Sequence, residues 1–333
     1  MGKRNKMRVR LIQVTQNPID VMWTAARTCY SAKSPIEIWD DWGLQVGELK
    51  LGVEKLSDAW EQEKEITNKH WNLVKKVLDS GHQSIAEHVY FTFAIEGISR
   101  ACSHQLVRHR AGIVFSQQSQ RYVEIKEDLD ELCHLYLELK RDPEDKQDKT
   151  VATFEKTEKL LEKYFVDVNS ETMEAYLDDL IFYKRYIDMG YKPEDARKFL
   201  PNATKTNITV SVNFRELIHM CNLRLCTRAQ KEIRDLHKLM KDEVKEVDER
   251  LASYLVPQCE VHGACFEDKC CSRKPKFEDV MNTYKNSKII KEENDMYQTI
   301  ISREDMEKLF QNEDNPEVQE KLRKLMEMKS VFE

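Results

Sequence analysis

Residues 105–122 hold the densest concentration of side chains able to do chemistry. An Arg-His-Arg triplet at 108–110 is followed by amide and hydroxyl side chains at Gln117 and Ser119 and by Arg121. Arg forks bind phosphate oxygens in pairs, and Gln or Ser can hydrogen-bond the edge of a heterocycle. The segment therefore predicts a site for an anionic heterocyclic ligand. The alternative is a solvated basic helix end, but amides and hydroxyls replace the Glu and Lys partners usual there.

Three other segments carry polar groups in similar settings. They are Gly-His-Gln-Ser at 81–84 with Glu87-His88, Ala-Arg-x-x-Leu-Pro at 196–201, and Asn213 to Arg224 at the start of a long apolar pattern. The last of these predicts a helix N-terminus, which is a ready anion site. Two His and one Glu at 82–88 do not have the His-Glu-x-x-His spacing of a helical metal site, so a metal there is not expected.

These segments must be positioned by a mixture of strands and helices. Polar and apolar alternation predicts strands over 7–14 and 205–212, and a run rich in β-branched and aromatic residues predicts one over 88–95. An extended segment is expected over 113–124. Helical spacing predicts helices over 18–32, 66–80, 99–107 and 151–190, and one long helix near 213–254 that begins with Asn213 as N-cap. The expected class is α+β, a single mixed domain with a central sheet flanked by helices and a charged C-terminal extension.

Composition narrows the class of protein. The 333 residues include only 9 Gly and 8 Pro, which is too few turn-forming residues for an all-β protein with many turns. No apolar run approaches the roughly 20 residues of a membrane span, and no signal peptide is evident, so a cytoplasmic location without membrane partners is expected. The formal net charge of -6 gives no reason to expect nucleic-acid binding.

The four polar segments, taken in order, resemble the flavin-dependent thymidylate synthase family over about residues 7–255. The family hallmark is Arg-His-Arg, seven residues and a Ser; here eight residues separate Arg110 from Ser119. We interpret the additional residue as a bulge within Ala111–Phe115. The resemblance implies an enzyme that methylates dUMP to dTMP, with methylenetetrahydrofolate as carbon donor and FAD, reduced by NADPH, as hydride carrier. It also implies a homotetramer with sites at subunit interfaces.

The same resemblance assigns roles to individual residues. Arg224 is the expected catalytic residue, because it can stabilise negative charge on the activated pyrimidine. The implied dUMP-binding residues are Gln105, Gln117, Ser119, Arg121, Arg197 and Arg224. The implied FAD-binding residues are His82, Ser84, Arg108, His109, Arg110, Gln117, Asn213 and His219. At 219 many family members have Asn, so this assignment rests on the hydrogen-bonding capacity that His shares with it.

The C-terminal part falls outside the resemblance. We expect a catalytic domain over 1–257, with 33–65 as an insertion, and a Cys-cluster and charged helical tail over 258–333. No metal is expected in the active site. The cluster offers Cys259, His262, Cys265 and Cys270 as a weaker possibility for structural zinc, although the spacing is not the paired Cys-x2-Cys of strong zinc sites.

Two other functions remain open from the residues alone. The Arg-rich 100–121 segment could grip phosphates and stack bases in an RNA- or nucleotide-binding module. The second alternative is an interaction protein that is organised by the Cys cluster and the tail. Flavin absorbance of the purified protein separates the enzyme from both.

Overall fold

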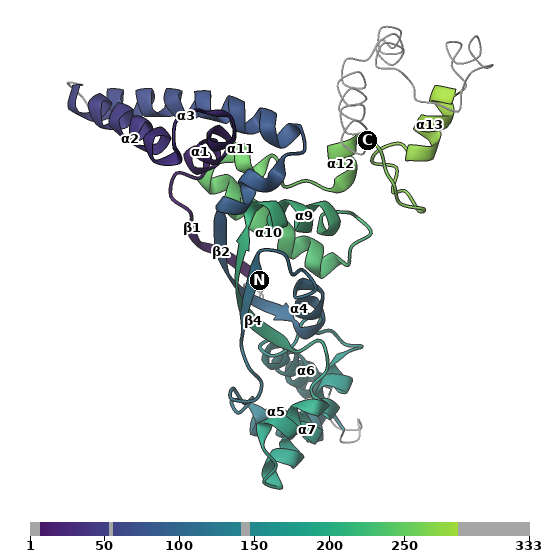
Figure 1. The fold of residues 1–333 in the computed structure, drawn as a ribbon. Coiled ribbons are helices and arrows are strands. Elements are labelled where there is room, and N and C mark those ends of the chain that lie inside the picture. The colour runs from purple at the N-terminus through teal and green to yellow at the C-terminus, as the bar shows by residue number, and fades with distance from the viewer. Residues whose placement is uncertain (1–6, 53–55, 141–146, 286–333) are drawn as a thin grey trace. The chain divides into compact units, whose positions relative to one another are not determined.

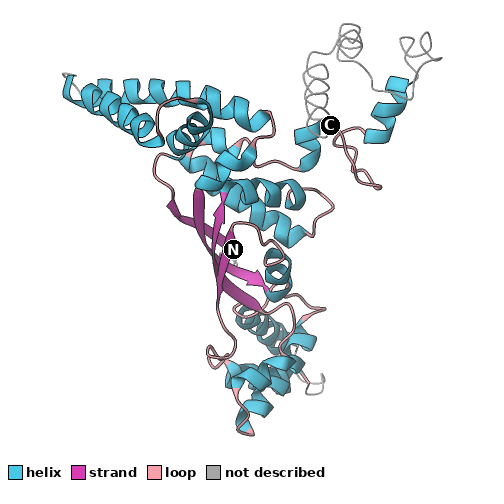
Figure 2. Cartoon of the chain, viewed as in Figure 1, coloured by secondary structure: helices cyan, strands magenta, loops and turns pink. Residues whose placement is uncertain are grey.

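The computed structural model describes residues 7–52, 56–140 and 147–285. The predicted tail beyond residue 285 lies outside the described residues. In the described part, helices predominate and the strands form one four-stranded sheet (Figure 2). The predicted α+β class is thereby confirmed.

The sheet has the order β1-β2-β4-β3. Its strands are β1 (Arg8–Val14), β2 (Tyr90–Ser99), β3 (Ile113–Gln117) and β4 (Lys205–Asn213). All four match predicted extended segments. β2 pairs with β4, although the two strands lie more than a hundred residues apart in the chain (Figure 1). This pairing positions the segments that follow the two strands.

The longer helices are α1 (Pro18–Tyr30), α2 (Pro35–Gly52), α3 (Leu56–Asp79), α4 (Arg100–Leu106), α5 (Leu129–Leu139), α6 (Gln147–Leu161), α7 (Met173–Asp188), α9 (Phe214–Arg224), α10 (Lys231–Val247) and α13 (Phe277–Lys285). The short ones are η1 (Gln83–His88), α8 (Pro193–Ala196), η3 (Arg197–Phe199), α11 (Glu249–Ala252) and α12 (Gln258–His262).

The chain divides into two compact units. Unit 1 comprises Met1–Ile12 and Thr92–Ser211, and unit 2 comprises Gln13–Phe91 and Val212–Glu333. In unit 1, helices α5, α6 and α7 pack on one another around Leu132, Leu161 and Leu180 (Figure 1). These apolar side chains are almost wholly removed from water, which is the main stabilising contribution to this helical cluster.

In unit 2, α1 packs against α3. His70 of α3 makes a buried 2.6 Å contact from Nδ1 to Asp20 Oδ1 and stacks on Trp23 with 3.8 Å between ring centroids. A buried carboxylate needs such a partner, because desolvation of an unpaired charge is costly. Gly81, predicted to end the 66–80 helix, follows α3 with φ +84, a conformation that glycine adopts without strain.

The 33–65 segment, expected as an insertion, contains α2 and the first part of α3, which pack against each other. Two predicted helical segments differ from the structure. The 151–190 segment is helical but divided, because α6 ends at Leu161 and α7 begins at Met173. The helical region near 213–254 is present but forms α9, α10 and α11 rather than one helix. The first break is held by Arg234, whose Nη1 donates to the carbonyls of Thr227 (2.6 Å) and Ala229 (3.2 Å). The second lies at Asp248, which caps α11 by accepting from Arg250 N.

Candidate functional site

The end of β3 and the turn after it carry three predicted dUMP ligands in unit 1. Gln117 Nε2 donates to Ser103 Oγ (2.9 Å) and to Thr206 Oγ1 (3.2 Å), so its side chain is fixed between α4 and β4. Ser119 Oγ accepts from the backbone N–H of Arg121 at 3.2 Å. This bond closes a tight turn, which replaces the fully extended 113–124 segment of the prediction.

The two predicted phosphate ligands meet at one acidic residue. Arg121 Nε and Nη2 each lie 3.0 Å from Glu194 Oε2, and Arg197 Nε donates to the backbone carbonyl of Glu194 at 3.2 Å. Glu194 belongs to α8, whose first turn begins at Pro193. Sequence reasoning missed Glu194, because a half-buried Glu at the start of a short helix has no feature that distinguishes it.

A third guanidinium lies near this pair. Burial lowers the pKa of Arg100, and the positive charge of Arg197 lowers it further. Arg100 is the first residue of α4, where Ser99 caps the helix by accepting from Cys102 N at 2.9 Å. Neighbouring guanidinium groups repel each other, so an anion placed among them would be stabilised. Arg100 lay within the Arg-rich segment of the sequence but was not singled out.

The Arg-His-Arg triplet follows α4 directly. His109 is buried, with 6% of its surface exposed, whereas Arg108 and Arg110 on either side are exposed. This alternation anchors the loop through the His and leaves both guanidinium groups accessible to a phosphate. Gln105 at the end of α4 is half-buried. Ala111 and Gly112 then form a turn with φ +60 at Gly112, in the stretch where the additional residue was expected.

In unit 2, η1 packs against α9, and an ion pair between Arg215 and Glu87 joins them. His82 and Ser84 are exposed at the start of η1, and His219 is exposed on α9. The structure thus brings four predicted FAD ligands onto two packed elements: His82, Ser84, Asn213 and His219.

Asn213 also has a structural role. Its Oδ1 accepts from Glu216 N at 2.8 Å and caps α9, as predicted from the sequence. The cap engages the side-chain oxygen and leaves the amide nitrogen as the donor for a ligand. Arg224 is the last residue of α9 and is half-buried.

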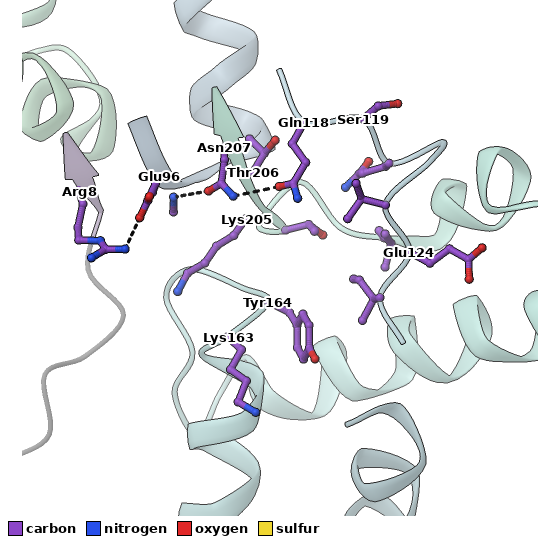
Figure 3. A pocket seen from close by; sticks show the side chains of 16 residues that line it. Arg8, Glu96, Gln118, Ser119, Glu124, Lys163, Tyr164, Lys205, Thr206 and Asn207 are labelled. Atoms are coloured by element: carbon purple, nitrogen blue, oxygen red, sulfur yellow. Dashed lines mark hydrogen bonds and ion pairs between the residues drawn. The ribbon is translucent and has the colours of Figure 1, made fainter. Parts of the chain in front are cut away.

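A pocket of about 310 Å³ in unit 1 adjoins Ser119 (Figure 3). Two cationic side chains that line the pocket are paired with carboxylates. Arg8 pairs with Glu96, and Lys163 Nζ lies 2.5 Å from Asp128 Oδ2. Burial lowers the pKa of Lys205, which lines the same pocket. Of the predicted site residues, only Ser119 lines it, so this pocket does not gather the Arg residues expected to hold a phosphate.

The chain was compared with known proteins. The family model described as "Thymidylate synthase complementing protein" matches residues 10–248. A flavin-dependent thymidylate synthase from Clostridium tetani is 37% identical over 267 residues, 80% of this chain and 93% of that protein. One from Thermococcus onnurineus is 37% identical over 270 residues, 79% and 91% of the two chains. The chain belongs to the flavin-dependent thymidylate synthase family.

The family resemblance noted in the sequence is thereby confirmed, and the chain is an enzyme of this family. The fold agrees with the crystal structure of a UMP/dUMP methylase from Streptomyces cacaoi bound with 5-Br dUMP, at a TM-score of 0.50 and 20% identity, covering 75% of this chain and 95% of that chain. Among the described residues, no helix is long and apolar enough to cross a membrane.

Proposed function

We propose that this member of the flavin-dependent thymidylate synthase family converts dUMP to dTMP, with methylenetetrahydrofolate as carbon donor and FAD, reduced by NADPH, as hydride carrier. The observation that carries the proposal is that Arg121 and Arg197 both contact Glu194. Arg121 lies two residues after Ser119 in the chain. A carboxylate there makes the charge-assisted contacts that a nucleotide phosphate would make.

The donor set of the chain fits FAD. Exposed Arg108 and Arg110 can meet a diphosphate, with His109 beside them, and each charge-assisted hydrogen bond contributes about 1.5–3 kcal/mol. The capped N-terminus of α9 adds backbone donors next to Asn213. His82, Ser84, Gln117 and His219 complete the proposed set. Reduced FAD supplies the hydride when it is bound.

For dUMP, we assign the phosphate to Arg121 and Arg197 and the nucleoside to Gln105, Gln117 and Ser119. Arg224 stabilises the negative charge that develops on the pyrimidine as its C5 becomes nucleophilic. Ser119 donates a hydrogen bond and is not a nucleophile, because its closest described partner is the backbone N–H of Arg121 and no general base is bonded to it among the described residues.

A homotetramer with sites at subunit interfaces is part of the proposal. Its support is the family to which the chain belongs. Light scattering of the purified protein tests it: a monomer that still turns over dUMP contradicts a tetrameric site.

The decisive experiment follows release of tritium from [5-³H]dUMP. Methylation at C5 displaces that hydrogen, so release should require NADPH, FAD and methylenetetrahydrofolate together, each omitted in turn. Release that persists without FAD contradicts the flavin-dependent route. A protein without flavin absorbance that copurifies with nucleic acid would instead favour the RNA-binding alternative for residues 100–121.

A further inference from the structure

The turn that interrupts the predicted long helix carries a cysteine that faces the Cys cluster. A pocket of about 100 Å³ in unit 2 is lined by the side chains of four cysteines from three segments of the chain: Cys226, Cys259, Cys265 and Cys271. Cys226 lies between α9 and α10, Cys259 in α12, and the other two in the loop before α13. Sequence spacing pointed to Cys259 and Cys265 but not to Cys226, which lies more than thirty residues before them.

The four thiols are neighbours. All four line the same pocket of about 100 Å³. The Thr227 hydroxyl hydrogen-bonds the sulfur of Cys271, so the turn that carries Cys226 contacts the loop before α13.

Backbone donors are directed at two of these sulfur atoms. The backbone N–H of Glu267 donates to the Cys265 sulfur, and the backbone N–H of Arg273 donates to the Cys271 sulfur. In both cases the backbone donor is two residues after the Cys. N–H donors directed at sulfur complement a thiolate, the form that binds a metal.

Cations also surround the pocket. Arg228, Lys269 and Arg273 line it against the single acid Glu267. Arg228 holds the two sides together, because its Nη1 donates to the carbonyl of Lys269 at 3.3 Å and its Nε lies 3.4 Å from Glu267. A divalent ion with four thiolates has a net charge of −2, so this positive lining complements it.

We propose that Cys226, Cys259, Cys265 and Cys271 form a tetrathiolate site for a soft divalent metal ion, zinc being the expected one. Zinc prefers four sulfur ligands in a tetrahedron, and binding releases the thiol protons to solvent. Among the described residues, no group of three or more His, Cys, Asp or Glu already stands in a metal-binding arrangement. Binding as proposed therefore requires the four side chains to turn toward one another. This set replaces the earlier His262 and Cys270 with Cys226 and Cys271.

The neighbouring Cys270 serves a different purpose. Its sulfur donates to the carbonyl of Lys274 at 3.2 Å and accepts from Ser272 N at 3.3 Å, and it does not line the pocket. The Cys270 side chain also hydrogen-bonds Cys265. Serine can make all of these hydrogen bonds, so Cys270→Ser is a matched control for Cys271→Ser. The site closes the turn between α9 and α10 onto the segment before α13. Structural metal sites of this type contribute directly to folding stability.

The first test uses the unaltered full chain. Cys29 and Cys271 are both exposed. After reduction and removal of metal, iodoacetamide should alkylate both, as measured by peptide mass spectrometry. Added Zn²⁺ should slow alkylation of Cys271 by about tenfold or more and leave Cys29 unchanged, because a metal-bound thiolate loses its nucleophilicity. Equal rates at Cys271 with and without Zn²⁺ would overturn the proposal, and so would equal slowing at both cysteines.

The second test measures metal content and coordination. The full chain should contain one zinc per chain, and Co²⁺ in its place should give the intense sulfur-to-cobalt absorption of a tetrahedral thiolate site. Cys259→Ser and Cys271→Ser should lose zinc, with affinity lowered by at least about 100-fold, while Cys270→Ser retains it. Zinc retained by Cys271→Ser and lost by Cys270→Ser contradicts the assigned ligands. An absence of stoichiometric metal in the reduced full chain contradicts the site. Flavin content and dUMP turnover are not read out, so these outcomes are independent of the proposed function.

Discussion

Arg121 Nε donates to Oε2 of Glu194 over 3.0 Å, and Arg121 Nη2 lies 3.0 Å from the same oxygen. The two residues are 73 positions apart in the chain. Arg197 donates to the backbone carbonyl of the same Glu194, so this residue contacts both proposed phosphate ligands. A bound phosphate would have to displace this carboxylate from Arg121 or share the Arg with it.

This competition predicts the effect of Glu194→Gln. Removing the carboxylate charge should strengthen dUMP binding several-fold, because the dUMP phosphate then no longer has to displace a carboxylate from Arg121. Stability should change little, since an exposed ion pair contributes only about 0–1 kcal/mol. Isothermal titration of the flavin-loaded protein with dUMP measures it. Asp195→Asn is the control. Asp195 lies beside Glu194 in α8 but pairs with Lys198, at 2.8 Å, and not with a proposed ligand of dUMP. Weaker dUMP binding by Glu194→Gln would mean that the carboxylate positions Arg121 for the phosphate.

Ser119→Ala tests whether the hydroxyl donates a hydrogen bond or attacks covalently. The variant loses a donor to dUMP and also the acceptor for Arg121 N. We expect a loss of about 1–3 kcal/mol, roughly tenfold to a hundredfold in dUMP affinity or rate. Ser116→Ala, an exposed position on β3, should have almost no effect. Complete loss of turnover with intact dUMP binding would indicate a nucleophile.

Arg224→Ala should reduce turnover far more than folding or flavin content, because its charge is proposed to act on the pyrimidine in the transition state. Arg224→Lys should recover part of the rate by restoring the charge without the planar fork. Single-turnover rates and flavin absorbance of the same preparations separate the two effects. Near-normal turnover, or loss of flavin, would show that the role assigned to Arg224 is wrong.

Glu216 predicts a pH dependence of stability. Burial raises the pKa of this carboxyl, while the charge of His219 partly lowers it. A raised pKa means that the folded state binds the proton more tightly than the unfolded chain does. The carboxyl therefore supports folding most below the ordinary pKa of Glu, 4.5, and this support is lost as pH rises through the folded value.

Glu216→Gln should accordingly raise the melting temperature at pH 7–8, and the gain should vanish as the pH falls towards roughly 4. Thermal unfolding followed by circular dichroism across this range measures it. Glu171→Gln, at an exposed position of unit 1, should give no such trend. A variant destabilised equally at every pH would show that the ionised carboxylate is required by its neighbours.

The sequence predicted the elements whose cause is local. The strands over 7–14 and 205–212 follow from alternation, the one over 88–95 follows from β-branched and aromatic residues, and the caps at Asn213 and Gly81 follow from residue type. The break after α9 could not be predicted, because Leu225 and Ile233 on either side of it are both buried. In the sequence they continue the apolar pattern of a single helix. Its carbonyls are satisfied by Arg234, a contact that appears only when the chain is folded. The Arg121–Glu194 pair and the position of Cys226 depend on tertiary structure in the same way.

One residue more than in the family pattern separates Arg110 from Ser119. Ala111 and Gly112 form a turn before β3, and Gly112 has φ +60, a conformation that an L side chain rarely adopts. If the additional residue is accommodated in this turn, deleting Ala111 should shorten it without shifting β3, whose Gln117 is held by Ser103 and Thr206. Flavin content and dUMP affinity should then stay within a few-fold of the unaltered protein. Deleting Val114 is the contrasting variant: it removes a residue inside β3, and a one-residue slip turns every following side chain to the other face. Loss of both ligands in the Ala111 deletion as well would mean that the turn sets the register of Arg108 and Arg110, and that the motif aligns differently from the family pattern.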